Sequence, residues 1–173
     1  MKYLTDFIAA LFVFILFPLA EACSDNSSSR VSGGEYVSKR VGIPIPDCDV
    51  LYSENSHGGW LGDGETEIIL QFTSETAQTL TENIEANEHW RELPMDRFVE
   101  LIFYGGEYED RLFEAPFDGE APEIHEGYWF VYNKQTEEYS LDYETYREAY
   151  SHNYYISVYD SAEMKLYFYG SDS

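Results

Sequence analysis

The sequence predicts an α+β fold: a single domain with a mostly antiparallel sheet, one main helix and a C-terminal β-hairpin. Three observations support this prediction. Segments rich in aromatic and β-branched residues, which favour strands, outnumber the segments with helical spacing. Only one long segment places its apolar residues on one helical face after a capping residue. The connections between adjacent strand segments are short, which is typical of a mostly antiparallel sheet.

The first strong strand and the main helix have clear local signals. Residues 66–72 show the two-residue alternation of a strand. Thr73 or Ser74 then supplies a side-chain oxygen that can cap a helix. We expect this helix over about 74–90, because Pro94 requires it to end shortly before that position.

The remaining segments extend the sheet. Their composition predicts strands at 49–52, 98–104, 128–132, 154–159 and 166–169. Residues 107–126 are expected to form a long acidic loop, and residues 141–150 a short helix. Turn residues at 160–163 join the last two strands into the C-terminal hairpin. The core is expected around Ile68, Ile102, Phe130, Ile156 and Phe168.

An unbroken apolar run, Phe7 to Ala20, stands near the N-terminus. It is shorter than the roughly 20 residues of a membrane-spanning helix and fits the apolar part of an export signal, which has about 7–15 residues. We therefore predict a cleaved signal peptide over 1–22. The alternative is an uncleaved, tilted N-terminal anchor.

The cleavage region predicts a lipid anchor. Ala22 followed by Cys23 resembles a bacterial lipobox, in which the cysteine thiol is diacylated and becomes the new N-terminus. The polar, serine-rich segment that follows is typical of a tether, so residues 23–40 are interpreted as lipidated cysteine and flexible tether. The alternative is ordinary signal-peptidase cleavage and secretion, after which Cys23 could form a disulfide with Cys48.

The negative charge belongs to the expected folded domain, residues 41–173. The chain has 33 acidic and 10 basic residues, and four of each precede residue 41. The domain therefore carries the whole formal charge of −23, which excludes nucleic acid as a partner and favours a cationic protein or ligand. Solubility in a salty exterior is the alternative explanation.

A glycine-rich segment, 56–64, is the densest candidate for a functional site. It contains His57, Trp60 and Asp63, which offer an imidazole, an aromatic ring and a carboxylate. We interpret it as a ligand-binding loop. The alternative is a tight turn with Trp60 in the core. It lacks the lysine of a phosphate-binding loop and precedes a strand where that motif opens a helix.

Other chemical motifs give little signal. The four histidines do not have the spacing of a local zinc motif, and no G-x-S-x-G is present. Cys48 stands between Asp47 and Asp49, whose charges would raise the pKa of its thiol and blunt its nucleophilicity. Acidic residues around His125 could hold a hard cation, but they lack the order of a calcium loop. We assign no catalytic, cofactor-binding or metal-ligating residue and expect no cofactor.

Several segments resemble a group of small uncharacterised lipoproteins of clostridia and related Firmicutes. The similarity is carried by residues 57–66, the Trp90 to Pro94 step, Gly127–Phe130 and 159–169, and would span about 41–170. This group has Phe at the position of Trp60. It has no established activity, so the resemblance implies a Gram-positive host and no function.

Together these observations predict an exported, membrane-anchored surface lipoprotein that acts as a binding or interaction module. Its N-terminal lipid would hold it on the extracellular face of the cell membrane. Two alternatives stay open. One is an extracellular hydrolase that uses His57 and Asp63, and the other is a cation-binding protein.

Overall fold

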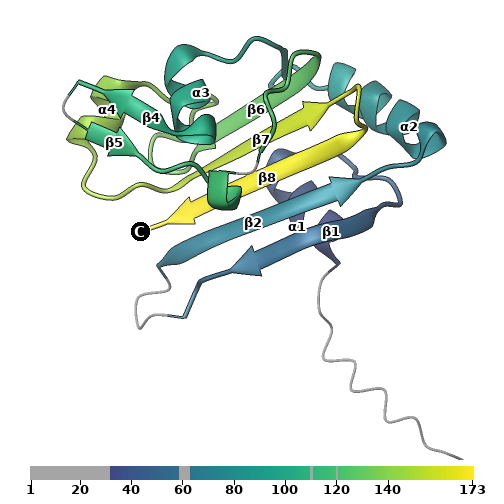
Figure 1. Cartoon of the computed structure of the whole chain (residues 1–173), viewed down its shortest axis with the longest axis horizontal. Helices are drawn as coiled ribbons and strands as arrows, with labels where there is room; N and C mark the ends of the chain where they lie inside the picture. The colour runs from purple at the N-terminus through teal and green to yellow at the C-terminus, as the bar shows by residue number, and fades with distance from the viewer. Residues whose placement is uncertain (1–31, 59–62, 110, 120) are drawn as a thin grey trace, which may run out of the picture. The chain divides into compact units, whose positions relative to one another are not determined.

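An antiparallel sheet with helices on both faces forms the described part of the chain, which comprises residues 32–58, 63–109, 111–119 and 121–173 of a computed structural model (Figure 1). The strands are β1 (Asp49–Asn55), β2 (Gly64–Gln71), β3 (Arg91–Glu92), β4 (Gly106–Tyr108), β5 (Arg111–Phe113), β6 (Gly127–Asn133), β7 (Tyr154–Asp160) and β8 (Lys165–Asp172). Within the described residues, six strands form the main sheet in the order β1-β2-β8-β7-β6-β3, and β4 and β5 form a small hairpin.

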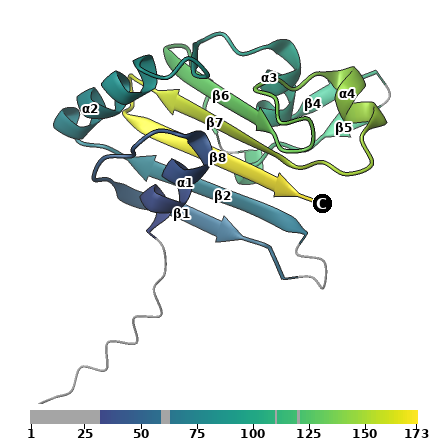
Figure 2. The same ribbon diagram turned by 180° about the vertical axis from the view of Figure 1, so that it is seen from behind.

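The helices cover both faces of this sheet. They are α1 (Gly33–Val41), α2 (Ser74–Glu85), α3 (Arg97–Tyr104) and α4 (Tyr143–Glu148), with a 3-10 turn η1 at Phe117–Gly119. The hairpin β4–β5 lies with α3 and α4 on one face (Figure 1), and α1 and α2 lie on the other (Figure 2). The predicted α+β class with a mostly antiparallel sheet is confirmed. No helix in the described residues is long and apolar enough to cross a membrane.

Two hydrophobic cores result, one on each face of the sheet. The front core, under α3 and α4, includes Val99, Ile102, Phe103, Trp129, Ile156, Val158 and Tyr167. The back core, under α1 and α2, includes Val37, Leu70, Leu80, Ile84, Phe130, Leu166 and Phe168. Successive side chains of a strand point to opposite faces, so β7 and β8 contribute to both cores. The five residues predicted for the core are all buried.

The local signals predicted β2 and the start of α2 correctly. The predicted end of the helix near residue 90 is wrong, because α2 ends at Glu85 and a turn follows, in which the N–H of Trp90 donates to the Asn87 carbonyl at 3.2 Å. β2 buries Thr66, Ile68 and Leu70 on one face, as the alternation requires. Thr73 is the N-cap of α2, and its hydroxyl accepts a hydrogen bond from the backbone N–H of Thr76 at 3.3 Å. The strands predicted near 49–52, 128–132, 154–159 and 166–169 and the C-terminal hairpin are also present.

The predicted strand over 98–104 is wrong, because this segment forms helix α3. Its buried residues are Phe98, Val99, Ile102 and Phe103, a spacing that places all four on one helical face. A continuous apolar run of this length fits a strand and a buried helix equally well by periodicity alone. In the fold, the apolar face of this segment packs on the sheet as a helix.

The predicted flexible tether is too long, because α1 begins at Gly33. Ser32 caps this helix by accepting a hydrogen bond from the backbone N–H of Glu35 at 3.2 Å. Val37 and Val41 have no exposed surface and belong to the back core. The folded domain therefore begins before residue 41.

The predicted loop over 107–126 is only partly a loop. Its first residues pair in the hairpin β4–β5, and η1 follows. Three-residue strands of this kind leave too short a pattern to recognise in the sequence. This hairpin matters for the site, because β5 forms one side of a cavity on the front face.

Candidate functional site

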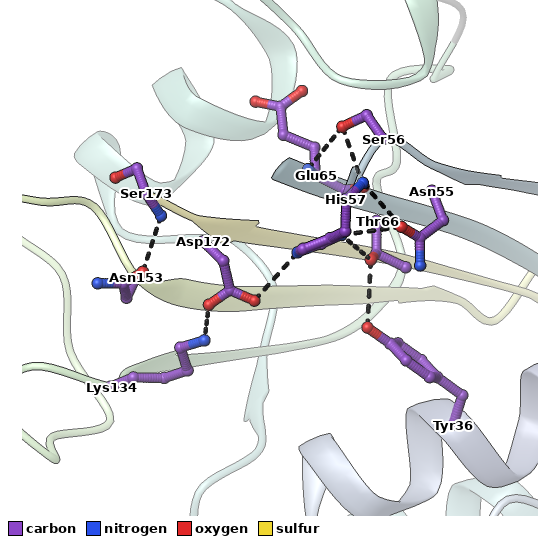
Figure 3. A network of polar contacts seen from close by, with 10 residues as sticks. All are labelled: Tyr36, Asn55, Ser56, His57, Glu65, Thr66, Lys134, Asn153, Asp172 and Ser173. Atoms are coloured by element: carbon purple, nitrogen blue, oxygen red, sulfur yellow. Dashed lines mark hydrogen bonds and ion pairs between the residues drawn. The ribbon is translucent and has the colours of Figure 1, made fainter. Parts of the chain in front are cut away.

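His57 lies after the end of β1 and contacts the C-terminal end of β8. Its Nε2 is 3.2 Å from Oδ2 of Asp172 (Figure 3). Its Nδ1 is 2.9 Å from Oδ1 of Asn55, which also accepts a hydrogen bond from the backbone N–H of His57. Because a backbone N–H needs an acceptor, the atom that Asn55 turns toward His57 is its amide oxygen. Both ring nitrogens of His57 therefore face oxygen atoms.

The contacts of His57 continue into a polar network that joins several elements. Asp172 forms an ion pair with Lys134 through its other oxygen. The hydroxyl of Thr66 lies 3.4 Å from Nδ1 of His57 and 3.1 Å from the hydroxyl of Tyr36 (Figure 3). The network therefore links α1, β2 and the C-terminal end of β8.

This geometry holds the imidazole of His57 in place and does not favour a role in acid–base catalysis. Both ring nitrogens of His57 contact side-chain oxygens, so a substrate could reach either nitrogen only by displacing one of these contacts. The nearest hydroxyl, that of Thr66, belongs to a residue that is 2% exposed. The hydroxyl of Ser56 accepts a hydrogen bond from the backbone N–H of Glu65 at 2.7 Å. The arrangement joins the residues after β1 to the C-terminal end of β8.

The other predicted site residues are not joined to His57 in the described structure. Asp63 is exposed and makes no hydrogen bond or ion pair with a described residue. Trp60 and Cys23 lie outside the described residues. Cys48 is a free, half-buried thiol, and burial, with smaller contributions from Asp47 and Asp49, raises its pKa above the ordinary value.

A cavity of about 510 Å³ opens on the front face, where the ends of β2, β7 and β8 meet β5 and the α4 region. We call it the front cavity. The side chains that give it its character are Glu65, Arg111, Tyr146, His152, Tyr154 and Tyr169. The lining thus combines aromatic rings with one guanidinium, one imidazole and two carboxylates, those of Glu65 and Glu114.

Glu65 and His152 of the front cavity each contact a tyrosine. The hydroxyl of Tyr169 donates a hydrogen bond to Glu65 at 2.6 Å. Burial, and then the charges of its neighbours, raise the pKa of Tyr169 far above its ordinary value, so this phenol stays a donor. The ring of His152 stacks on Tyr146 with 3.8 Å between centroids. Burial and the charge of Arg111 lower the pKa of His152, so its imidazole is neutral at neutral pH.

Arg111 is the group in the front cavity whose bonding capacity is unused. It is exposed and makes no hydrogen bond or ion pair with any described residue. Five of the eight lysines and arginines in the described residues pair with carboxylates. An unpaired guanidinium beside an aromatic cavity is therefore unusual in this acidic chain, and its planar donors are free for a ligand.

Sequence reasoning did not find the front cavity. Its polar residues come from separate elements, so no local motif contains them. One signal was present: Arg111 is the one lysine or arginine in the acidic segment 107–126.

Two further findings concern metal binding and similarity to known proteins. In the part of the chain that the structure describes, no group of three or more His, Cys, Asp or Glu side chains could hold a metal ion. No known protein family, no curated protein and no solved structure matched the chain.

Proposed function

We propose that this protein is an exported, lipid-anchored binding module that takes a small polar ligand in the front cavity. The main supporting observation is an aromatic cavity of about 510 Å³ that is lined by both Glu65 and Arg111, whose guanidinium has no hydrogen-bond or ion-pair partner among the described residues. Ligand sites are commonly concave, about 300–1,000 Å³ in volume, and lined by aromatic side chains with a few convergent polar groups.

Charge favours a ligand that carries a cationic group. The formal charge of −23 attracts cations and speeds their encounter with the protein. At physiological salt, however, charges beyond about 8 Å are largely screened. Affinity must therefore come from local contacts, and Glu65 can supply one to a cation while Arg111 receives a carboxylate or hydroxyl of the same ligand.

The front cavity can be tested with paired variants. A panel of sugars, amino acids and short basic peptides would be titrated calorimetrically into the parent, Arg111→Gln and Tyr146→Ala. We expect a ligand whose affinity falls at least about tenfold in both variants, which corresponds to about 1.4 kcal/mol each. Higher salt should also weaken its binding.

Arg97→Gln is the matched control for this experiment. Arg97 also has no carboxylate partner among the described residues, and its guanidinium lies over the ring of Tyr108, 5.5 Å from the centroid, away from the front cavity. It should leave the affinity unchanged. If Arg111→Gln binds the ligand as tightly as the parent does, the binding site lies outside the front cavity.

An extracellular hydrolase remains the second candidate, because His57 does contact a carboxylate, that of Asp172. The engaged ring nitrogens and the buried Thr66 hydroxyl weigh against it. Hydrolysis of any substrate that His57→Ala abolishes while the domain stays folded would favour this candidate over the binding module.

The lipid anchor makes a separate prediction. The full chain expressed in a Gram-positive host should fractionate with the membrane, and Cys23→Ala should shift most of it to the soluble fraction. Two acyl chains hold a protein on a bilayer far more firmly than one signal alone. Cys48→Ala is the matched cysteine control and should fractionate as the parent does. A Cys23→Ala protein that stays equally membrane-bound would argue for an uncleaved N-terminal anchor.

A further inference from the structure

A second cavity, of about 290 Å³, lies on the opposite face of the sheet beside the C-terminal end of α1. We call it the back cavity. Its polar and aromatic lining comprises Lys39, Arg40, Asn87, His89, Tyr132 and Tyr139. None of its described lining residues is acidic, although acidic residues outnumber basic ones by 33 to 10 in the chain. This cavity is therefore a basic site on an acidic protein.

Arg40 is the central cation of the back cavity, and it has no carboxylate partner among the described residues. Its guanidinium lies over the ring of Tyr36, 3.3 Å from the centroid, and Nη1 donates a hydrogen bond to the Tyr36 carbonyl at 3.1 Å. Its Nε is buried and has no hydrogen-bond partner in the described part of the chain. Glu35, on the same helix, pairs with Lys39 at 2.8 Å. Among the described residues, the charge of Arg40 is therefore met by a tyrosine ring and a carbonyl and by no carboxylate.

A second cation lies close to Arg40. Both Arg40 and Lys134 contact the ring of Tyr155, with Cζ and Nζ at 5.6 Å and 4.9 Å from its centroid. Burial, and then the charge of Arg40, lower the pKa of Lys134. Asp172 is the carboxylate paired with Lys134, and it is shared with His57. Because Asp172 pairs with Lys134, the positive charge left for an anion is that of Arg40.

Flat rings line the remaining wall of the back cavity. His89 stacks on Tyr139 with 3.5 Å between centroids and 2° between ring planes. Tyr132 lies 5.1 Å from Tyr139, which is 37% exposed. A planar apolar group could pack against these rings, since aromatic pairs are stable at such separations.

We propose that the back cavity binds a small aromatic anion, with its carboxylate or phosphate group on Arg40 and its ring against Tyr139 and Tyr132. Guanidinium pairs well with either oxyanion through parallel hydrogen bonds. The volume lies near the lower end of that of known ligand sites, about 300 Å³, so the ligand is small. This inference is independent of the front cavity, which lies on the other face of the sheet.

Benzoate, phenyl phosphate, inorganic phosphate and uncharged benzyl alcohol are suitable probes. Each would be titrated into the full chain in a non-ionic detergent and followed calorimetrically. We expect millimolar or tighter binding of benzoate or phenyl phosphate, and much weaker binding of the other two. The preference between the two aromatic anions tells which oxyanion the site takes. Binding of inorganic phosphate as tight as that of phenyl phosphate would overturn the aromatic part of the proposal.

Arg40→Gln should weaken binding of the aromatic anion at least about tenfold, or about 1.4 kcal/mol. Arg97→Gln, which removes another tyrosine-stacked guanidinium, and Arg111→Gln should both bind as the parent does. If Arg40→Gln does not fold, Tyr139→Ala is measured in its place, because it removes a partly exposed ring that the proposal places against the ligand. The proposal is overturned if neither aromatic anion binds at millimolar concentration, or if a folded Arg40→Gln binds unchanged.

Discussion

Replacement of Gly127 by alanine is expected to reduce the free energy of unfolding by about 3 kcal/mol or more. Gly127 opens β6 with a φ of +144°, which residues with a Cβ rarely adopt. A Cβ at this position would lie 1.8 Å from the carbonyl oxygen of Tyr159 on the paired strand β7. Relief of that clash requires separation of β6 from β7, which breaks the ladder at their paired ends. Urea denaturation of the purified domain measures the loss.

Two other glycines serve as controls for Gly127→Ala. A Cβ on Gly58 would meet, among the described residues, only the carbonyl oxygen of Ser56, at 3.8 Å, so Gly58→Ala should change stability by less than about 0.5 kcal/mol. Gly119 has a φ of +74°, and a Cβ there would meet no described residue within 4 Å, so Gly119→Ala should show backbone strain alone, about 1–2 kcal/mol. Equal losses at positions 58 and 127 would contradict the clash.

Replacement of Ile102 by alanine should cost about 2–5 kcal/mol, as expected for the removal of buried methyl and methylene groups from a core. Ile102 is 4% exposed and lies on α3 in the front core. Leu112→Ala deletes a similar aliphatic side chain that is 77% exposed, and should cost less than about 0.5 kcal/mol. A cost for Ile102→Ala as small as this control would place Ile102 outside the core.

The elements predicted correctly are those whose signals are local. The alternation in β2 and the capping hydroxyl of Thr73 each lie within a few residues. The segment of α3 was predicted as a strand because its composition is aromatic and β-branched. The spacing of its apolar residues, such as Val99 and Ile102, is compatible with a helix as well as with a strand. Only the sheet beneath it, built from distant segments, distinguishes the two.

The start of the domain carries a local sequence signal. Ser32 as a cap with Glu35 three residues later, followed by Val37 and Val41 at helical spacing, is an N-terminal helix signature. The polar, serine-rich composition before this segment favoured a continuous tether. Burial of both valines against the sheet supplies stability that the segment's own sequence does not show.

The site could not be derived from local patterns, because its contacts are long-range. His57 meets Asp172, which is 115 residues away, and not the nearby Asp63. The front cavity takes Glu65 from β2 and Arg111 from β5. Only pairing of β2 with β8 and packing of the hairpin on the front face bring such residues together.

The sharing of β7 and β8 between both cores has a consequence for how the domain unfolds. Ile156 of β7 and Tyr167 of β8 point into the front core, whereas Tyr159 and Phe168 point into the back core. Neither layer of helices can detach without exposing apolar faces of the same two strands. The domain should therefore lose its structure in one cooperative step. The amide hydrogens in the middle of these strands should exchange with solvent only through global unfolding, more slowly than those of the edge strand β1.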